Sequence, residues 1–222
     1  MNRVLRGKFV TLKHFIMKIL NIFEYEILSN LNGYKIRKLH RPSLMFVKEK
    51  LGKDLVVAEV GVWKGENAED MLKYLPIKKI YLIDPWDLDV EEGAKNIENL
   101  TDNINEEEMR QAERETIKRM SKFKDKVVII RKSSTEALKD IKDKLDFVYM
   151  DIFGARKDKG IRKEIENYYK KLKKGGIIAG DDIDNGKSGS LGNGVPNAVS
   201  RFATENNLDL FINKRDWWCI KK

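Results

Sequence analysis

Cysteine, histidine and long apolar runs are scarce in this chain of 222 residues. The one cysteine, Cys219, excludes a disulfide within the chain, so we expect a reducing, cytoplasmic compartment and a core thiol in the strand-like DWWCIKK. The two histidines, His14 and His40, lie in the N-terminal region, which argues against a catalytic triad or a histidine-rich zinc site elsewhere. No run approaches the roughly 18 apolar residues of a membrane span.

Basic residues outnumber acidic ones, and the formal net charge is +9. An excess of this size favours acidic partners such as nucleic acid or anionic lipid. The lysines and arginines are nevertheless spread along the chain, without a compact cluster that carries interleaved aromatic residues. The sequence therefore does not favour a nucleic-acid partner, although the charge leaves one open.

The first 50 residues differ from the rest. Apolar and basic residues alternate there at helical spacing, which predicts a basic amphipathic helical extension over 1–50. Such a helix packs on its own domain, joins two subunits of a homo-oligomer or lies on a membrane surface. The apolar positions are Phe9, Leu12, Phe15, Ile16, Ile19, Phe23 and Ile27.

From residue 51 to 222, apolar β-branched runs alternate with helical patterns. Continuous apolar runs suit strands that are buried on both faces of a parallel sheet. Two short final strands are joined too tightly for a crossover and should pair antiparallel. The chain is therefore predicted to hold a Rossmann-like α/β domain with helices on both faces of a mostly parallel sheet. Strands are expected at 55–60, 78–84, 125–131, 145–152, 175–182, 208–213 and 216–221, and helices at 66–75, 105–122, 134–143, 158–173 and 195–206.

The first strand of this domain runs into the turn EVGVWKG at 59–65. Gly61 permits a sharp turn, and Gly65 permits close packing of the next helix. A dinucleotide fingerprint needs a glycine where Trp63 stands, so a pyrophosphate on this turn is disfavoured. The charge of Glu59 suits a cationic ligand such as S-adenosylmethionine.

Polar and aromatic residues follow the second and third strands. Asp84 is placed to accept hydrogen bonds from both ribose hydroxyls of an adenosine ligand, or to cap a helix, and Trp86 is suited to stack on adenine. Ser134 or Thr135 is expected to cap the next helix, and a hydroxyl there could instead face the adenine amino group.

Carboxylates end the next two strands, with Asp151 after the fourth and Asp181 and Asp182 after the fifth. Neighbouring strand ends lie about 5 Å apart, so the three carboxylates could converge on Mg²⁺. Alternatively, one faces the amine of the cofactor and the others cap the next segment or pair with lysines. The glycine-rich segment 185–195 is expected to be a lid, a substrate loop or a plain connector.

From about residue 40 to 222, these motifs resemble those of class I S-adenosylmethionine-dependent methyltransferases, within them the macrocin-type and catechol-type O-methyltransferase branch. The motifs are AEVGVWKGENA, YLIDPW, SSTEAL, DFVYMDI and LKKGGIIAGDD. The resemblance implies a seven-stranded sheet whose last strand is antiparallel, a Mg²⁺ ion on Asp151, Asp181 and Asp182, and catalytic roles for Asp151 and Asp182. It implies a cofactor site of Glu59, Gly61, Val62, Gly65, Asp84, Trp86, Ser134 and Asp151.

The implied reaction is metal-assisted methyl transfer to a hydroxyl of a small molecule, such as a sugar, a natural product or a catechol. Related enzymes often carry His or Lys just after the acid that matches Asp151, whereas Gly154 stands there in this chain. Proton removal must then come from elsewhere or from metal activation. The alternatives are an RNA or protein methyltransferase and a module that binds the cofactor without catalysis. The absence of an NPPY-type motif after the fourth strand disfavours methylation of base amino groups, and Trp63 disfavours a nicotinamide oxidoreductase.

Overall fold

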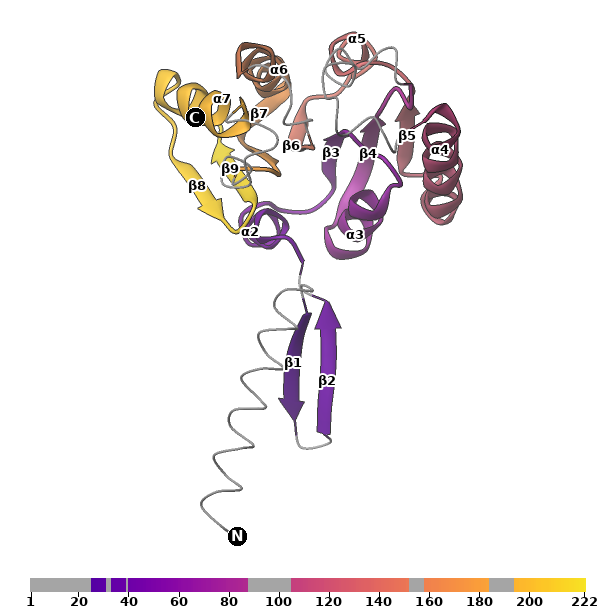
Figure 1. Ribbon diagram of the computed structural model, residues 1–222. Coiled ribbons are helices and arrows are strands. Elements are labelled where there is room, and N and C mark those ends of the chain that lie inside the picture. The colour runs from indigo at the N-terminus through magenta and orange to yellow at the C-terminus, as the bar shows by residue number, and fades with distance from the viewer. Residues whose placement is uncertain (1–24, 31–32, 39, 88–104, 152–157, 184–193) are drawn as a thin grey trace, which may run out of the picture. The chain divides into compact units, whose positions relative to one another are not determined.

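The computed structural model describes residues 25–30, 33–38, 40–87, 105–151, 158–183 and 194–222 (Figure 1). The chain divides into two compact units, Met1–Arg41 and Pro42–Lys222. Three sequence-based predictions concern residues outside the described ranges: the amphipathic helix up to residue 24, the position of Gly154, and the glycine-rich loop up to residue 193.

The described part of the first unit is a β-hairpin. Its strands β1 (Tyr25–Asn30) and β2 (Gly33–Lys38) pair antiparallel, with Ile27 opposite Ile36. The prediction of a helical extension is therefore wrong for these strands. The helical spacing of the N-terminal stretch continues through Ile27, but the chain pairs there as strands, and Asn32-Gly33 is a strong hairpin signal in the sequence.

The boundary between the units also differs from the predicted one at residue 50. Helix α2 (Pro42–Lys50) belongs to the second unit, because its buried residues Leu44 and Val47 are part of that unit's core. Pro42 opens this helix at its first position, where a missing N–H costs no hydrogen bond.

The second unit is built on a seven-stranded sheet in the order β5-β4-β3-β6-β7-β9-β8 (Figure 1). The parallel strands are β3 (Leu55–Val60), β4 (Ile77–Ile83), β5 (Val127–Ile130), β6 (Leu145–Met150) and β7 (Leu172–Gly180). Strand β9 (Asp216–Ile220) is antiparallel both to β7 and to β8 (Leu210–Asn213). The predicted mostly parallel sheet with an antiparallel last strand is confirmed.

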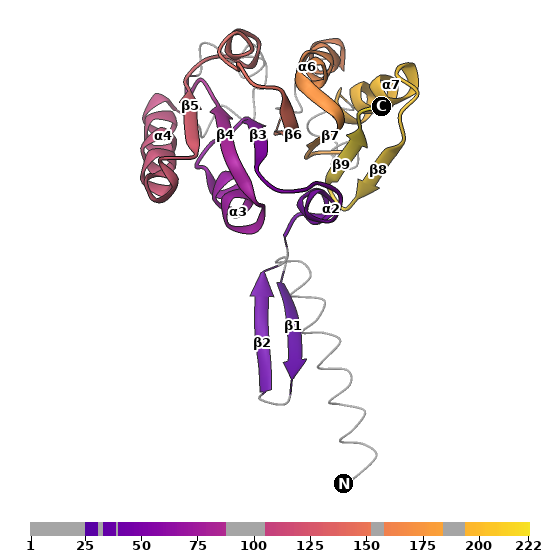
Figure 2. The ribbon, with the colours of Figure 1, turned by 180° about the vertical axis from the view of Figure 1, so that it is seen from behind.

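Helices cover both faces of this sheet, as predicted; Figures 1 and 2 show α5, α6 and α7 along one face and α2 and α3 along the other. The helices after α2 are α3 (Glu66–Tyr74), α4 (Glu106–Met120), α5 (Ser134–Ala137), α6 (Asp158–Lys171) and α7 (Gly194–Glu205), and the short 3₁₀ helix η2 (Ser121–Phe123) follows α4. Helix α5 is shorter than predicted, because the Asp140 N–H donates to the Ala137 carbonyl in a tighter turn. In the described part of the chain, no helix is long and apolar enough to cross a membrane.

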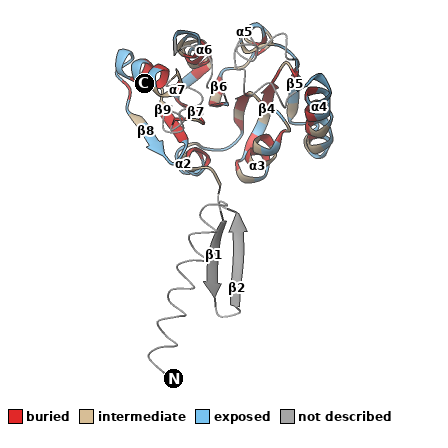
Figure 3. Ribbon diagram, viewed as in Figure 1, coloured by how far each residue is buried: buried red, intermediate tan, exposed pale blue. Residues whose placement is uncertain are grey.

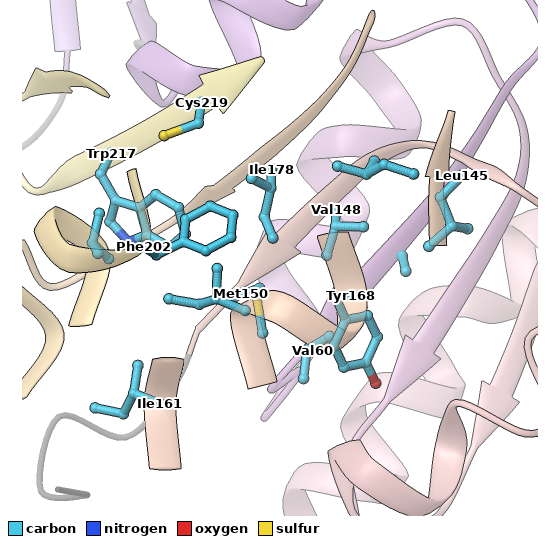
Figure 4. Packing of buried hydrophobic residues seen from close by; sticks show 14 of the residues in the cluster. Val60, Leu145, Val148, Met150, Ile161, Tyr168, Ile178, Phe202, Trp217 and Cys219 are labelled. Carbon is cyan, nitrogen blue, oxygen red and sulfur yellow. The ribbon is translucent and has the colours of Figure 1, made fainter. Parts of the chain in front are cut away.

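Each face of the sheet has its own apolar core, and the buried residues lie between the sheet and the helices (Figure 3). Alternate residues of one strand serve the two cores: Val57 belongs to the core under α2 and α3, and Ala58 to the opposite one. Figure 4 shows the core that contains Ala58, in which Trp217 of β9 and Phe202 of α7 are fully buried. The packing of these cores fixes the positions of the strand ends, where the candidate functional site lies.

A buried carboxylate ties the first helix of the unit to its last strand. Asp216, 2% exposed, accepts hydrogen bonds from the Ser43 N–H at 3.1 Å and from the Ser43 hydroxyl, both at Oδ2. Its Oδ1 accepts one from the Tyr149 hydroxyl at 3.2 Å. These donors compensate the loss of water around the carboxylate, so Asp216 serves as a cap for α2 that comes from the opposite end of the chain.

The single cysteine allows a test of this core. Cys219 is fully buried in β9, and burial raises the pKa of its thiol to about 12. We predict that the native protein does not react with Ellman's reagent at about pH 8 and that the urea-unfolded protein reacts fully, because the thiolate is the reactive form. Fast reaction of the native protein would show that β9 is not packed as described.

Candidate functional site

The carboxyl ends of the parallel strands meet along one edge of the sheet. The residues that follow neighbouring strands are joined there by main-chain hydrogen bonds, and the chain order reverses between β3 and β6, where ligands bind in open α/β sheets. The structure thus brings together the strand-end residues that the sequence singles out. The bonds run from N–H to carbonyl in the pairs Gly61–Ile83 (2.9 Å), Asp84–Ile130 (3.3 Å), Asp151–Val60 (2.8 Å) and Asp181–Met150 (3.3 Å).

The turn after β3 requires its two glycines for different reasons. Gly61 has φ +81°, and a Cβ atom there would lie 2.2 Å from the carbonyl oxygen of Asp151. Gly65 has φ +72°, and a Cβ there would lie 3.1 Å from the side chain of Thr116 on α4. The predicted sharp turn at Gly61 and close helix packing at Gly65 are both present in the structure.

Asp84 holds this turn against the end of β4. Its Oδ2 accepts hydrogen bonds from the N–H groups of Val62 at 2.8 Å and Trp63 at 2.9 Å, and its Oδ1 accepts one from the Trp86 N–H at 2.8 Å. Burial raises the pKa of Asp84, and the three N–H bonds oppose that shift. A carboxylate offers about four acceptor positions, so these three bonds leave Asp84 able to accept from a ribose, and its contact with the ribose hydroxyls stays a prediction.

The two tryptophans at this turn have different environments. Trp86 is 2% exposed, belongs to the core and donates its indole N–H to the Trp63 carbonyl at 2.8 Å. The Thr116 hydroxyl donates to the same carbonyl at 2.7 Å. Trp63 as a whole residue is 37% exposed, so the structure favours Trp63 over Trp86 as the aromatic residue that a ligand can reach.

Glu59 lies below the turn on β3, with 1% of its surface exposed. Its Oε1 accepts a hydrogen bond from the side-chain amide of Asn67 on α3 at 2.8 Å. A charge at such depth is weakly screened and acts on ligands over several ångströms. The prediction that Glu59 attracts a cationic group of the ligand stays a prediction, and the structure places the residue directly before the turn.

The serines after β5 do not act as predicted. Ser133, and neither Ser134 nor Thr135, caps α5, since its hydroxyl oxygen accepts from the Glu136 N–H. The Ser133-x-x-Glu136 spacing of a capping box is the signal in the sequence that identifies this cap. The Ser134 hydroxyl instead donates to the carboxylate of Glu164 on α6, and it remains able to accept a hydrogen bond from an amino group.

Asp181 and Asp182 form an acidic corner at the end of β7. Asp181 is 7% exposed, and its Oδ1 accepts from the Asp182 N–H at 2.8 Å, while Asp182 has φ +66°. Arg215, in the turn between β8 and β9, places Nε 3.2 Å from Oδ1 of Asp181 and also bonds Oδ1 of Asp182. The sequence analysis missed Arg215, because no local pattern marks a surface arginine as the partner of two acids, of which the nearer is 33 residues away.

This corner does not fit the predicted Mg²⁺ site. In the described ranges, no three Asp, Glu, His or Cys side chains come together as a metal-binding group. Two of the three predicted ligands, Asp181 and Asp182, share a guanidinium that already supplies the opposite charge. The cofactor set fits better, because Asp84 retains an acceptor position beside the Gly61 turn and Glu59 supplies a negative charge.

Two glycines allow a matched test of the turn. Gly61 and Gly175 have similar left-handed φ angles, +81° and +77°, but a Cβ at Gly175 would meet nothing within 4 Å. We predict that Gly175→Ala lowers the free energy of unfolding by about 1–2 kcal/mol, the cost of the left-handed conformation. Gly61→Ala should cost roughly 2–5 kcal/mol, because its methyl group also collides with the Asp151 carbonyl. Equal losses in urea unfolding would contradict the close approach of Asp151 to the turn.

The model of a family described as "Methyltransferase domain" matches residues 58–183, more than half of the chain. The matched segment begins in β3 and ends just after the acidic corner, so it contains the strand ends described above. No curated protein sequence matches the chain.

Solved structures with the same fold include three that differ in their described activities. A candidate caffeoyl-CoA O-methyltransferase from Staphylococcus aureus is 15% identical with a TM-score of 0.58, covering 98% of this chain and 100% of its own. A candidate methyltransferase from Streptococcus mutans in complex with S-adenosylhomocysteine is 16% identical with a TM-score of 0.56, covering 82% and 98%. An rRNA methylase from Streptococcus thermophilus is 19% identical with a TM-score of 0.52, covering 82% and 96%. At these identities the likeness shows the shared fold and does not distinguish between acceptors.

Proposed function

The chain belongs to the methyltransferase-domain family and is an S-adenosylmethionine-dependent methyltransferase, and we propose that it methylates a hydroxyl oxygen of a small-molecule acceptor. The observation that carries this proposal is the position of Asp151. Its main chain abuts the Gly61 turn, with its N–H bonded to the Val60 carbonyl at 2.8 Å, and the residue is exposed at the end of β6. An accessible carboxylate beside the cofactor turn is suited to accept a proton from a hydroxyl.

The residues of the turn have separate tasks in this proposal. When bound, S-adenosylmethionine supplies a methyl group on a positively charged sulfur. Glu59 favours the positive charge of the ligand, and Asp84 accepts one hydrogen bond from its ribose. Asp151 takes the proton of the acceptor hydroxyl as the new carbon–oxygen bond forms and the carbon–sulfur bond breaks, which leaves a neutral thioether.

A small-molecule acceptor is favoured over RNA by the charge of this edge. Asp151 is exposed at the strand ends, where a phosphate backbone would meet its negative charge, while Arg215 offsets the charges of Asp181 and Asp182. The net charge of +9 still keeps an RNA acceptor as the second candidate, and RNA binding that weakens steeply with salt would identify it.

Calorimetric titration of S-adenosylhomocysteine tests the cofactor site. We predict micromolar binding by the wild type, loss of binding in Asp84→Ala and about tenfold weaker binding in Glu59→Gln, because a buried negative charge opposite the ligand amine is removed. NAD should not bind, since Trp63 stands where its pyrophosphate would approach the turn.

Asp143→Asn is the matched control for these variants, because Asp143 precedes β6 at the opposite edge of the sheet and pairs with Lys79 on the surface. Circular dichroism shows whether Asp84→Ala still folds, and Glu59→Gln keeps the test valid if it does not. Tighter binding of NAD than of S-adenosylhomocysteine would overturn the assignment.

A screen of phenols, catechols and sugar hydroxyls with labelled methyl donor tests the reaction. For an acceptor that turns over, we predict that Asp151→Asn lowers kcat by roughly 10²–10⁴-fold, the usual contribution of a general base. S-Adenosylhomocysteine binding, measured in parallel, separates a lost base from a lost cofactor site. Unchanged kcat in Asp151→Asn would remove Asp151 from the proton-transfer step.

A further inference from the structure

Arg215 bridges two carboxylates that the sequence alone assigns to a metal ion. Its Nε lies 3.2 Å from Oδ1 of Asp181, and the other end of the guanidinium bonds Oδ1 of Asp182. The two acids are largely buried, with 7% and 15% of their side chains exposed, whereas the arginine side chain is 58% exposed. The acids are therefore the fixed part of the corner, and the arginine covers them from the solvent side.

Hydrogen bonds also hold the main chain at Arg215 and the residue that follows it. Its carbonyl accepts a hydrogen bond from the Ile183 N–H at 3.2 Å, immediately after the acidic corner. The next residue, Asp216, is buried and bonded to Ser43 and Tyr149. The main chain at Arg215 is therefore anchored, which keeps the guanidinium within reach of both acids.

The chemistry of the two cations explains why they exclude each other here. Mg²⁺ requires oxygen ligands at about 2.0–2.1 Å in a near-ideal octahedron. A guanidinium binds the same oxygens through fixed, planar N–H groups and never loses its charge. The Oδ1 atoms of Asp181 and Asp182 both bond the guanidinium, so a metal ion that used them would first have to displace Arg215.

We propose that Arg215 takes the place of a divalent cation in this chain, so that an internal arginine neutralises Asp181 and Asp182 and methyl transfer proceeds without a metal ion. Arg215 is then a positioning residue: it holds the acidic corner in shape beside the acceptor and touches no reacting atom. This inference rests on the proposed function, because the corner matters to catalysis only where a methyl acceptor binds at the same edge.

Binding of Mn²⁺ to the purified full chain, measured by electron paramagnetic resonance, tests the proposal. We expect no saturable binding by the wild type up to about 1 mM, the weak end of protein sites for hard divalent cations. The affinity for S-adenosylhomocysteine should be the same in EDTA and in Mn²⁺. One bound Mn²⁺ per chain that Asp182→Asn removes would overturn the proposal, even if the cofactor binds as expected. Failure to bind S-adenosylhomocysteine in either buffer would instead overturn the proposed function.

A double-mutant cycle tests the neutralising role of Arg215 directly. Arg215→Gln should lower the melting temperature by about 2–4 °C for a domain of this size, because it leaves two neighbouring carboxylates uncompensated. Adding Asp182→Asn should restore most of that loss, and Arg215→Lys, which keeps the charge, should lose less than Arg215→Gln. Lys214→Gln removes the same charge from the same exposed turn and should leave the melting temperature unchanged. Additive losses in the double variant would show that Arg215 acts only through packing and would overturn the proposal.

Discussion

The carboxylate of Asp84 holds the two loops of the candidate cofactor site together. It bonds the N–H groups of Val62 and Trp63 in the turn after β3 and that of Trp86 after β4. Trp63 and Trp86 both have left-handed conformations, and the bonds of their N–H groups to Asp84 stabilise these conformations. The two turns are therefore ordered without a ligand, which reduces the conformational entropy that binding at this edge must remove.

The distribution of charge also favours a cationic ligand at this edge. The chain as a whole is basic, with a net charge of +9, yet Asp84, Asp151 and Asp181 directly follow three of its five parallel strands, while Arg131 follows β5. Acidic side chains attract ligands of positive charge, and buried charges such as that of Glu59 are little screened by salt. A sulfonium with an ammonium group matches this edge, whereas a dinucleotide with its pyrophosphate does not.

The sequence predicts those parts of the molecule that depend on local pattern. The apolar runs give the strands within a few residues, and the residues after them, Gly61, Asp84 and Asp151, lie at one edge of the sheet because parallel strands end together. The errors occur where long-range pairing decides. The hairpin of β1 and β2 was missed because a helical spacing of apolar residues continues through Ile27. The bond of Ser43 to Asp216 and that of Arg215 to Asp181 join residues far apart in the chain, so no local pattern predicts them.

The antiparallel last strand explains why the end of the chain completes the site. A parallel strand presents only its carboxyl end at the functional edge. Because β9 runs in the opposite direction, with Trp217 beside Gly180, its first residue and the turn before it lie at the level of the acidic corner. Gly180 makes this approach possible, since a Cβ there would lie 2.8 Å from the indole nitrogen of Trp217. The reversed direction of β9 thus brings Arg215 to Asp181 and Asp182, and it brings Asp216 to the start of α2. The geometry of the acidic corner therefore depends on the final hairpin of β8 and β9, as that of the turn after β3 depends on its glycines.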